Sequence, residues 1–403
     1  MVSQQNNKFD FFLSFYIFLL VFGGIGGALQ PIRIFIIICT PLMLIYNKEN
    51  LLSFCRNETI IFVIWFIYAV ASLPFVVDIT ESIQEPLYLL LYFLGFYVFV
   101  FFAINAGNPK KSIVRGWIAF FVVTLPIAFV ELFFDKHLAI SAQDEGNVMN
   151  YGDGVIIDRF FASVTFGNLN GYNTVLVYIL PFVFGFLLYV SNSKQKKLIL
   201  FSIFLILSLV YIIIINSSRA ATGALIITTI IFMFNFAKNV KSLLWFLALL
   251  GVAIYVFLSF FPEIFIVIIS RAQLQGFGDA SRSEIILKGL DALVNSRFFG
   301  VGTGNFQSVM SNVYGLRLTA AHNLFLEILV QYGIIIFSLF IFELCHFLRK
   351  QRRIVGVHYK FIVVTSIILL PLSSIINSGY LLNASFWLLF YSLYVLSDKR
   401  FEV

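Results

Sequence analysis

About twelve runs of mostly apolar residues divide this 403-residue chain, and each is close to the ~20 residues that a helix needs to cross a lipid bilayer. The runs lie at 9–28, 31–46, 59–77, 86–106, 113–134, 171–190, 198–215, 220–237, 242–261, 323–348, 359–377 and 380–397. Hydrophobic residues make up 60% of the chain and charged residues 12%, whereas soluble domains contain about 45–50% and about 25%. We therefore expect an all-α polytopic membrane protein with about 12 transmembrane helices, in which residues 1–403 form a single membrane domain.

The basic residues predict how these spans are oriented. Most of the 27 Lys and Arg residues lie in segments that an inside N-terminus assigns to the cytoplasm, whereas the outer turn at 78–85 is acidic. Cytoplasmic loops carry such an excess of Lys and Arg, so we expect both termini to be cytoplasmic. The net charge of +7 then reflects membrane orientation, and we expect no nucleic-acid partner. The three cysteines lack the spacing of a metal site or a disulfide framework, so we expect neither.

Two outer segments, 135–170 and 262–322, are longer than simple connections, which favours a functional role. In the second, Ser281 followed three residues later by Glu284 forms a capping box. It predicts a helix that continues to about Asn295. Apolar residues at helical spacing form a stripe that we expect to rest on the membrane surface or on other helices. This stripe consists of Ile286, Leu290, Leu293 and Val294.

Three arginines are candidates for function near the outer face. Arg282 and Arg297 lie at the two ends of the predicted loop helix, and Arg219 lies between two spans with almost no loop. One interpretation is that these side chains extend to lipid phosphates. The alternative for Arg219 is a cation that holds an anion in a cavity under the large loop, because a lone arginine there runs against the positive-inside bias.

A glycine-rich segment and a histidine complete the candidates. The segment Gly300–Phe306 lacks the strand, helix and third-glycine spacing of a dinucleotide motif. We expect a flexible loop that lines a substrate cavity, because glycine permits unusual dihedral angles and close backbone approach. His322 directly precedes the tenth span, where a charged and unpaired histidine is costly. It either has a chemical task or is a neutral side chain that is hydrogen-bonded to loop carbonyls.

Together these residues resemble the bacterial O-antigen ligase and polymerase superfamily, chiefly over residues 155–340. The shared pattern is an arginine at an outer helix end, a second arginine in a large outer loop, a Gly-x-Gly stretch and an Ala-His-Asn entry into the next helix. In this sequence the pattern is formed by Arg219, Arg282, Gly300–Phe306, Ala321, His322 and Asn323. The stretch from Arg159 to Asn170 and the segment Gln331–Gly333 also fit it.

The resemblance implies a GT-C-like, metal-independent glycosyltransferase in the bacterial inner membrane, with a periplasmic active site and no cofactor. Family members transfer a glycan from an undecaprenyl-pyrophosphate carrier. Polymerases transfer it to another lipid-linked repeat unit, and ligases transfer it to lipid A-core. The ligase pattern after His322 fails at Ile336, and the Gly-x-Gly-x-Gly stretch is well formed, so we favour a polymerase over a ligase. Membrane lipids and a chain-length regulator are further candidate partners.

The resemblance and the chemistry of the side chains together predict roles. We predict that Arg219 and Arg282 hold the pyrophosphate, because fixed guanidinium groups stabilise the charge that the leaving group gains. His322 is predicted to position the acceptor hydroxyl or to take its proton. The other substrate-binding candidates are Arg159, Asn170, Arg297, Gly302, Gly304 and Asn323. The alternative from another class is a transporter or lipid-glycan flippase, but transporters place ionisable residues nearer the midplane.

Overall fold

The computed structural model describes residues 7–140, 148–151, 155–158, 161–192, 195–236 and 280–402. The chain packs as two compact units. Unit 1 contains Met1–Phe120, Ala280–Val355 and Asn377–Val403, and unit 2 contains Phe121–Asp279 and Gly356–Ile376. The predicted ninth span, 242–261, lies outside the described residues.

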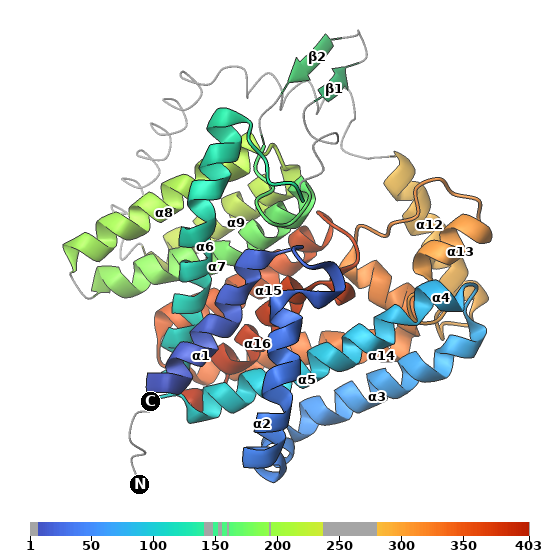
Figure 1. Ribbon diagram of the computed structural model, residues 1–403, viewed down its shortest axis with the longest axis horizontal. Coiled ribbons are helices and arrows are strands. Elements are labelled where there is room, and N and C mark those ends of the chain that lie inside the picture. The colour runs from blue at the N-terminus through green and yellow to red at the C-terminus, as the bar shows by residue number, and fades with distance from the viewer. Residues whose placement is uncertain are drawn as a thin grey trace. The chain divides into compact units, whose positions relative to one another are not determined.

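Unit 1 is helical (Figure 1). Its α-helices are α1 (Asn7–Phe18), α2 (Pro31–Phe54), α3 (Arg56–Ser72), α4 (Ile79–Ser82), α5 (Gln84–Asn105), the first part of α6 (Pro109–Phe134), α12 (Ala280–Asn295), α13 (Phe306–Asn312), α14 (Leu324–Lys350) and α16 (Ala384–Ser397). Short 3-10 helices lie at Leu19–Phe22, Gly27–Leu29, Leu73–Phe75, Gln351–Arg353, Tyr380–Leu382 and Lys399–Phe401. Every residue of α16 is buried, and α16 packs against α5 and α14. A helix that is apolar on all sides belongs in a core, so α16 is the central helix of unit 1.

Unit 2 contains the rest of α6 together with α7 (Leu169–Asn192), α8 (Lys196–Ile215), α9 (Arg219–Phe236) and α15 (Val357–Ser374). Helix α7 packs against α8, α9 and α15 and is mostly buried, so it is the central helix of this unit. The first long loop contains an antiparallel hairpin of β1 (Val148–Tyr151) and β2 (Val155–Asp158), in which Val148 pairs with Asp158. The sequence analysis did not predict this hairpin.

The prediction of an all-α polytopic membrane protein is confirmed. Eight helices in the described part of the chain are long and apolar enough to cross a bilayer, and Pro31–Tyr46 and Ala384–Ser397 are apolar but shorter. The number of twelve spans stays a prediction. The first predicted span, 9–28, is wrong in length, because the α-helix ends at Phe18 and the 3-10 turn after it reaches only Phe22. Gly23, Gly26 and Gly27 then adopt positive φ, which a helix does not continue through.

The predicted loop helix is present as α12, and a face other than the predicted apolar stripe packs on the neighbouring helices, so contact of the stripe with the membrane surface stays a prediction. Ile286, Leu290 and Val294 are 40%, 40% and 56% exposed, so three of the four stripe residues do not pack within unit 1. Ile285 and Ala292 are buried instead, in a cluster with residues of α13 and α14. Tertiary contacts with these two helices select a face rotated by one residue. The exposed apolar residues remain available to lipid.

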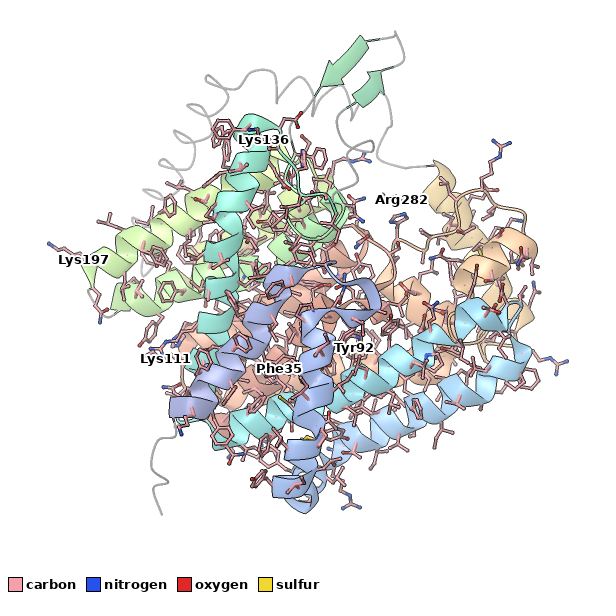
Figure 2. All side chains as sticks on the ribbon, viewed as in Figure 1. Phe35, Tyr92, Lys111, Lys136, Lys197 and Arg282 are labelled. Carbon is pink, nitrogen blue, oxygen red and sulfur yellow. The ribbon has the colours of Figure 1, made fainter. Side chains whose placement is uncertain are left out.

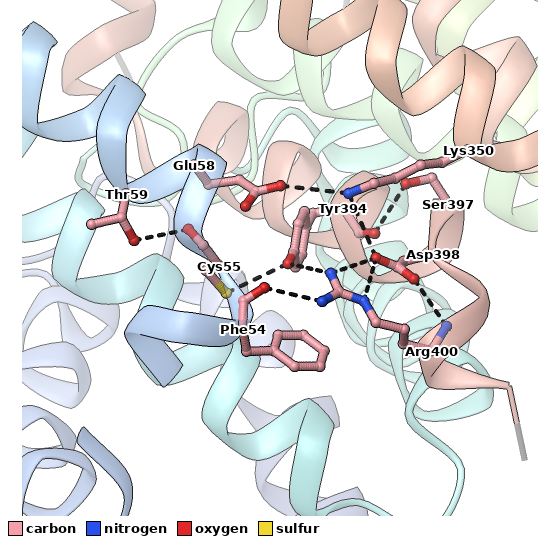
Figure 3. Close-up of polar contacts among 9 residues, drawn as sticks. All are labelled: Phe54, Cys55, Glu58, Thr59, Lys350, Tyr394, Ser397, Asp398 and Arg400. Carbon is pink, nitrogen blue, oxygen red and sulfur yellow. Dashed lines mark hydrogen bonds and ion pairs between the residues drawn. The ribbon is translucent and has the colours of Figure 1, made fainter. Parts of the chain in front are cut away.

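A polar cluster joins the ends of four helices of unit 1 (Figure 3). Lys350 Nζ at the end of α14 lies 3.5 Å from Glu58 Oε1 of α3 and 3.5 Å from Asp398 Oδ2 after α16. Arg400 binds Asp398 Oδ2 through Nη2 at 2.7 Å and donates to the carbonyl of Phe54, the last residue of α2, at 3.0 Å. Two basic side chains therefore connect these helix ends through two carboxylates, at the end of the unit that we expect to face the cytoplasm.

Candidate functional site

Helix α14 is broken at Gly333, where φ is 71° and ψ is −176°. A regular helix would pair the amide of Ile334 with the carbonyl of Val330. Instead, the Ile334 amide donates to the Phe298 carbonyl at 3.0 Å, and the Val330 carbonyl accepts from the Val301 amide at 2.8 Å. The large loop thus supplies the backbone partners that the break would otherwise leave unsatisfied.

The loop that enters this break, Gly300–Asn305, is held in place at several points. The Gly302 amide donates to the Gln331 carbonyl at 3.0 Å. The buried Asn305 side chain donates to the Val301 carbonyl at 2.7 Å and accepts from the Val77 amide at 3.0 Å. The expectation of a flexible loop is therefore wrong. Glycine serves close packing here, because a Cβ on Gly304 would lie 2.8 Å from the Cα of Ser82.

A buried chain of hydrogen bonds runs from this loop to α5. The Thr303 amide donates to the Ser72 hydroxyl at 3.1 Å. The Thr303 and Tyr332 hydroxyls lie 2.8 Å apart, and the Tyr332 hydroxyl donates to the Glu85 carboxylate. Because the single proton of Tyr332 is used on Glu85, Thr303 must donate to Tyr332. Such a connected network fixes its members in one arrangement, so the Glu85 carboxylate is held in position.

This network borders a cavity of about 220 Å³. Its polar lining consists of three carboxylates, three side-chain amides and one hydroxyl group: Glu81, Glu85, Glu327, Gln84, Gln307, Gln331 and Ser378. The remaining lining residues are Gly304, Phe306, Ala321, Gly379 and Leu382. Glu85, Glu327 and Gln331 are buried at its inner end, and Glu81, Gln84 and Gln307 are exposed at its rim. Ala321 brings the cavity next to the backbone of His322.

A larger and mostly apolar cavity of about 560 Å³ lies against the same loop. Its lining comes from α3, the segment after it, α12, the loop and α13, and includes Tyr68, Phe75, Phe299, Val309 and Val313. Phe75, Phe299 and Val313 are exposed. One loop therefore separates a polar cavity from an apolar one, and Gly304 and Gly302 line the polar and the apolar cavity respectively.

The start of α14 places His322 and Asn323 in different roles. The Asn323 side chain accepts hydrogen bonds from the amides of Phe325 and Leu326 at 3.0 and 3.2 Å, so Asn323 is the N-cap of α14. His322 is half-buried and has φ 41°, a left-handed conformation that non-glycine residues adopt only when the surroundings impose it. The turn before α14 therefore fixes the direction of the histidine.

The two loop arginines occupy opposite ends of α12. Arg282 is exposed in the first turn of the helix (Figure 2). Arg297 follows the helix with φ 54°, and its amide donates to the Val294 carbonyl while the Phe298 amide donates to the Leu293 carbonyl. These two bonds form a Schellman motif, in which the position of Arg297 is normally a glycine.

In unit 2, the turn before Arg219 rests on a buried polar clamp. The Asn216 side chain accepts from the Ala162 amide at 2.8 Å and donates to the Ala162 carbonyl at 3.0 Å. The Glu131 carboxylate accepts from the amides of Ser163 and Val164, both at 2.8 Å. Ala162, three positions after Arg159, is thus held against Asn216, three positions before Arg219. Arg219 itself is exposed and is the first residue of α9.

The other two predicted substrate-binding residues from this part of the sequence are Asn170 and Arg159. Asn170 is exposed in the first turn of α7, where its carbonyl accepts from the Thr174 hydroxyl at 2.9 Å. The side chain that caps this turn belongs to Asn168, which accepts from the Gly171 amide at 2.6 Å. Arg159 lies outside the described residues.

Within unit 1 the structure brings Gly302 against α14 and Gly304 against Ser82, and the polar cavity is lined by Ala321, the neighbour of His322, but not by Arg282 or Arg297. The sequence analysis missed the carboxylate of Glu85 and its partners Thr303 and Tyr332. A signal existed, because Glu85 and Glu327 interrupt or border apolar runs, and ionisable residues in such places usually have a function.

The sequence is similar to that of known proteins. Residues 201–341 match the family model of the O-antigen ligases, a stretch that includes Arg219, Arg282 and His322. The teichuronic acid biosynthesis protein TuaE of Bacillus subtilis (strain 168) is 24% identical over 326 residues, which cover 76% of this chain. They cover 61% of that relative, so the chain spans less than two thirds of its length. The resemblance predicted from the motifs is thereby confirmed: the chain is similar to the O-antigen ligase and polymerase superfamily, with the family match at residues 201–341.

Proposed function

We propose that this chain polymerises undecaprenyl-pyrophosphate-linked oligosaccharide repeat units into O-antigen or a related polysaccharide. The reaction takes place on the periplasmic face of a bacterial inner membrane, and both termini lie in the cytoplasm. The O-antigen ligase family match and the similarity to a teichuronic acid biosynthesis protein support a role in polysaccharide synthesis. The choice of polymerase rests on the sequence departure at Ile336 and on the Gly300–Phe306 stretch.

The observation that carries the proposal is the position of two arginines. Arg219 is the first residue of α9 and Arg282 lies in the first turn of α12, and both are exposed. A helix N-terminus already carries partial positive charge, so a cation there does not help the helix. The same place suits an anion, because backbone amides at a helix N-terminus and a guanidinium group can bind phosphate oxygens together.

The proposed reaction is a displacement at the sugar carbon that carries the pyrophosphate. An acceptor hydroxyl forms the new glycosidic bond, the bond to the pyrophosphate oxygen breaks, and the carrier leaves as the lipid pyrophosphate. Arg219 and Arg282 stabilise the negative charge of the leaving group. His322, whose direction is fixed by the turn before α14, takes the proton from the acceptor hydroxyl. The apolar cavity of about 560 Å³ suits the lipid part of a substrate.

The test is transfer by the purified protein in detergent, supplied with lipid-linked repeat units and no ion gradient. We expect polymer on the lipid carrier, and we expect Arg219→Ala and Arg282→Ala each to abolish it. The matched control is Arg352→Ala, which removes an exposed arginine that follows the C-terminal end of α14. Full-length polymer from either of the first two variants would refute the assignment of the arginines. Absence of any product with the wild-type protein, both without and with lipid A-core, would favour the transporter.

A ligase is the second candidate, because the matching family model is that of the O-antigen ligases. The same assay distinguishes the two when lipid A-core is added. Glycan that appears only on the core, with no growth on the lipid carrier, would establish a ligase and exclude the polymerase.

A further inference from the structure

Two buried polar atoms face the cavity of about 220 Å³ without a hydrogen-bond partner in the described part of the chain. They are Oε2 of Glu327 and Oε1 of Gln331, which lie one turn apart on α14. Their residues are only 5% and 2% exposed. A buried acceptor without a donor destabilises the fold, so such atoms in a native structure require an explanation.

The chemistry of the lining restricts what can bind there. The cavity has carboxylates and amides but no Lys, Arg or His among its lining residues. Three carboxylates repel a pyrophosphate, so this cavity does not hold the anionic end of the donor. Carboxyl and amide oxygens accept hydrogen bonds, and each carboxyl group offers more acceptor sites than donors in either protonation state. The lining therefore fits a ligand that offers several hydrogen-bond donors.

Two of the carboxylates are held in place by hydroxyl groups of the protein. Glu85 accepts from Tyr332, and Glu81 Oε2 accepts from the Ser308 hydroxyl at 2.7 Å. Glu327 is also anchored, because its carboxylate interacts with the amides of Gly379 and Tyr380. Acceptors fixed in this way bind a ligand at a lower entropic cost than mobile side chains do.

We propose that this cavity is a subsite for one sugar ring of the acceptor glycan, and that Glu327 and Gln331 accept hydrogen bonds from its hydroxyl groups. This inference rests on the proposed function and adds a binding site to it. A volume of about 220 Å³ is below the roughly 300 Å³ at which pockets for drug-sized ligands begin, so it suits a single ring. Phe306 and Leu382 supply apolar contacts for the C–H face of the ring.

The position of the cavity assigns the ring to the acceptor rather than to the donor. The donor sugar is attached to the pyrophosphate and must lie beside cations, whereas this cavity is acidic. Ala321 lines the cavity, and the next residue is His322, which we place at the acceptor hydroxyl. A metal ion is the other ligand for carboxylates, but no three His, Cys, Asp or Glu side chains of the described residues are grouped closely enough to hold one.

The test uses Glu327→Gln and Gln331→Met in the full chain. Gln at 327 keeps an oxygen for the amides of Gly379 and Tyr380 and replaces the second carboxyl oxygen with an amide nitrogen. The probe is the free oligosaccharide released from the lipid-linked repeat unit by mild acid, titrated into the purified protein in detergent. We expect each variant to weaken binding about tenfold or more, which corresponds to about 1.4 kcal/mol. In the transfer assay, we expect the KM for the acceptor to rise, while the protein binds the lipid-linked donor as tightly as wild type does.

The matched control is Glu343→Gln. Glu343 lies on the same helix, is equally buried and also has carboxylate oxygens without a partner in the described residues, but it does not line this cavity. We expect wild-type oligosaccharide affinity from it. Wild-type affinity and acceptor KM in both Glu327→Gln and Gln331→Met would overturn the subsite and leave the transfer function intact. Oligosaccharide binding that depends on Glu327 in a protein without transfer activity would support the subsite and overturn the transfer function.

Discussion

The amide of Ile334 donates to the carbonyl of Phe298 at 3.0 Å, so the second half of α14 begins with a hydrogen bond to the large loop. The loop and the helix break therefore form one structure, in which neither part satisfies its backbone alone. The same structure lines the polar cavity from two sides, through Gly304 of the loop and Gln331 of the helix. A change at the break should consequently reach the cavity.

We expect Gly333→Ala to lower the melting temperature strongly and to release the loop. Gly333 has φ 71°, and a Cβ there would overlap the carbonyl of Phe299. The measurement is thermal unfolding in detergent, combined with limited proteolysis within residues 298–305. Gly315→Ala is the control, because Gly315 has φ 67° but open space around it. Gly315→Ala should cost only the about 1–2 kcal/mol of a left-handed backbone conformation. Equal destabilisation by both variants would show that the close contact between Gly333 and the loop does not matter for stability.

The parts of this site that local sequence signals describe could be predicted. Ser281 and Glu284 predicted a helix to Asn295, and the observed α12 is Ala280–Asn295. Long apolar runs predicted the membrane fold, because a helix in lipid must satisfy its own backbone hydrogen bonds. Both signals act over a few turns of one segment, so no knowledge of neighbouring segments is needed.

The parts that depend on distant segments could not be predicted. Glu85 looked like part of an acidic outer turn, and its burial follows from Tyr332, which is far away in the sequence. The packed face of α12 is rotated because α13 and α14 cover it, and periodicity alone does not reveal which neighbour is present. The break at Gly333 is likewise invisible in an apolar run, because a single glycine is tolerated in many helices.

We expect Asn323→Ala to lower stability by about 1 kcal/mol through loss of the N-cap of α14. Asn323→Ser and Asn323→Asp should retain stability, because both side chains can accept the same amide hydrogen bonds. The measurement is the melting temperature of all three variants alongside their transfer rates. If Asn323 also binds substrate, as predicted from the sequence, Asn323→Ser loses transfer while its melting temperature stays at the wild-type value. Unchanged transfer by Asn323→Ser would restrict Asn323 to capping.

We expect the Asp398 cluster to contribute stability that disappears in acid. Burial raises the pKa of Asp398, but hydrogen bonds and charge from Arg400 outweigh it and hold the pKa below its usual 3.8. A depressed pKa in the folded state means that the contribution is complete above the unfolded pKa and is lost as the pH falls through the folded one. Asp398→Asn should therefore lower the free energy of unfolding at pH 7 by about 1 kcal/mol for a partly exposed pair, and with it the melting temperature. The difference from wild type should begin to shrink below about pH 4 and should close only below the pKa of Asp398 in the folded protein.

The control for this cluster is Lys399→Gln, which removes an exposed neighbouring charge that does not contact Asp398 in the described structure. Lys399→Gln should leave the melting temperature unchanged both at pH 7 and below about pH 4. A difference between Asp398→Asn and wild type that does not shrink as the pH falls below about 4 would show that lost packing, rather than the charge, causes the effect.

Arg297 gives the clearest separation of stability from activity. It occupies the left-handed position of a Schellman motif with φ 54°, where glycine is favoured, so an arginine there weakens the fold. Strain at such a position is explained if the side chain has a function. We expect Arg297→Gly to raise stability by about 1 kcal/mol and to reduce glycan transfer. Arg297→Ala should reduce transfer equally without the gain in stability, because alanine is strained in the same way. Wild-type transfer by Arg297→Gly would remove Arg297 from substrate binding and leave its conformation as a feature of the helix end alone.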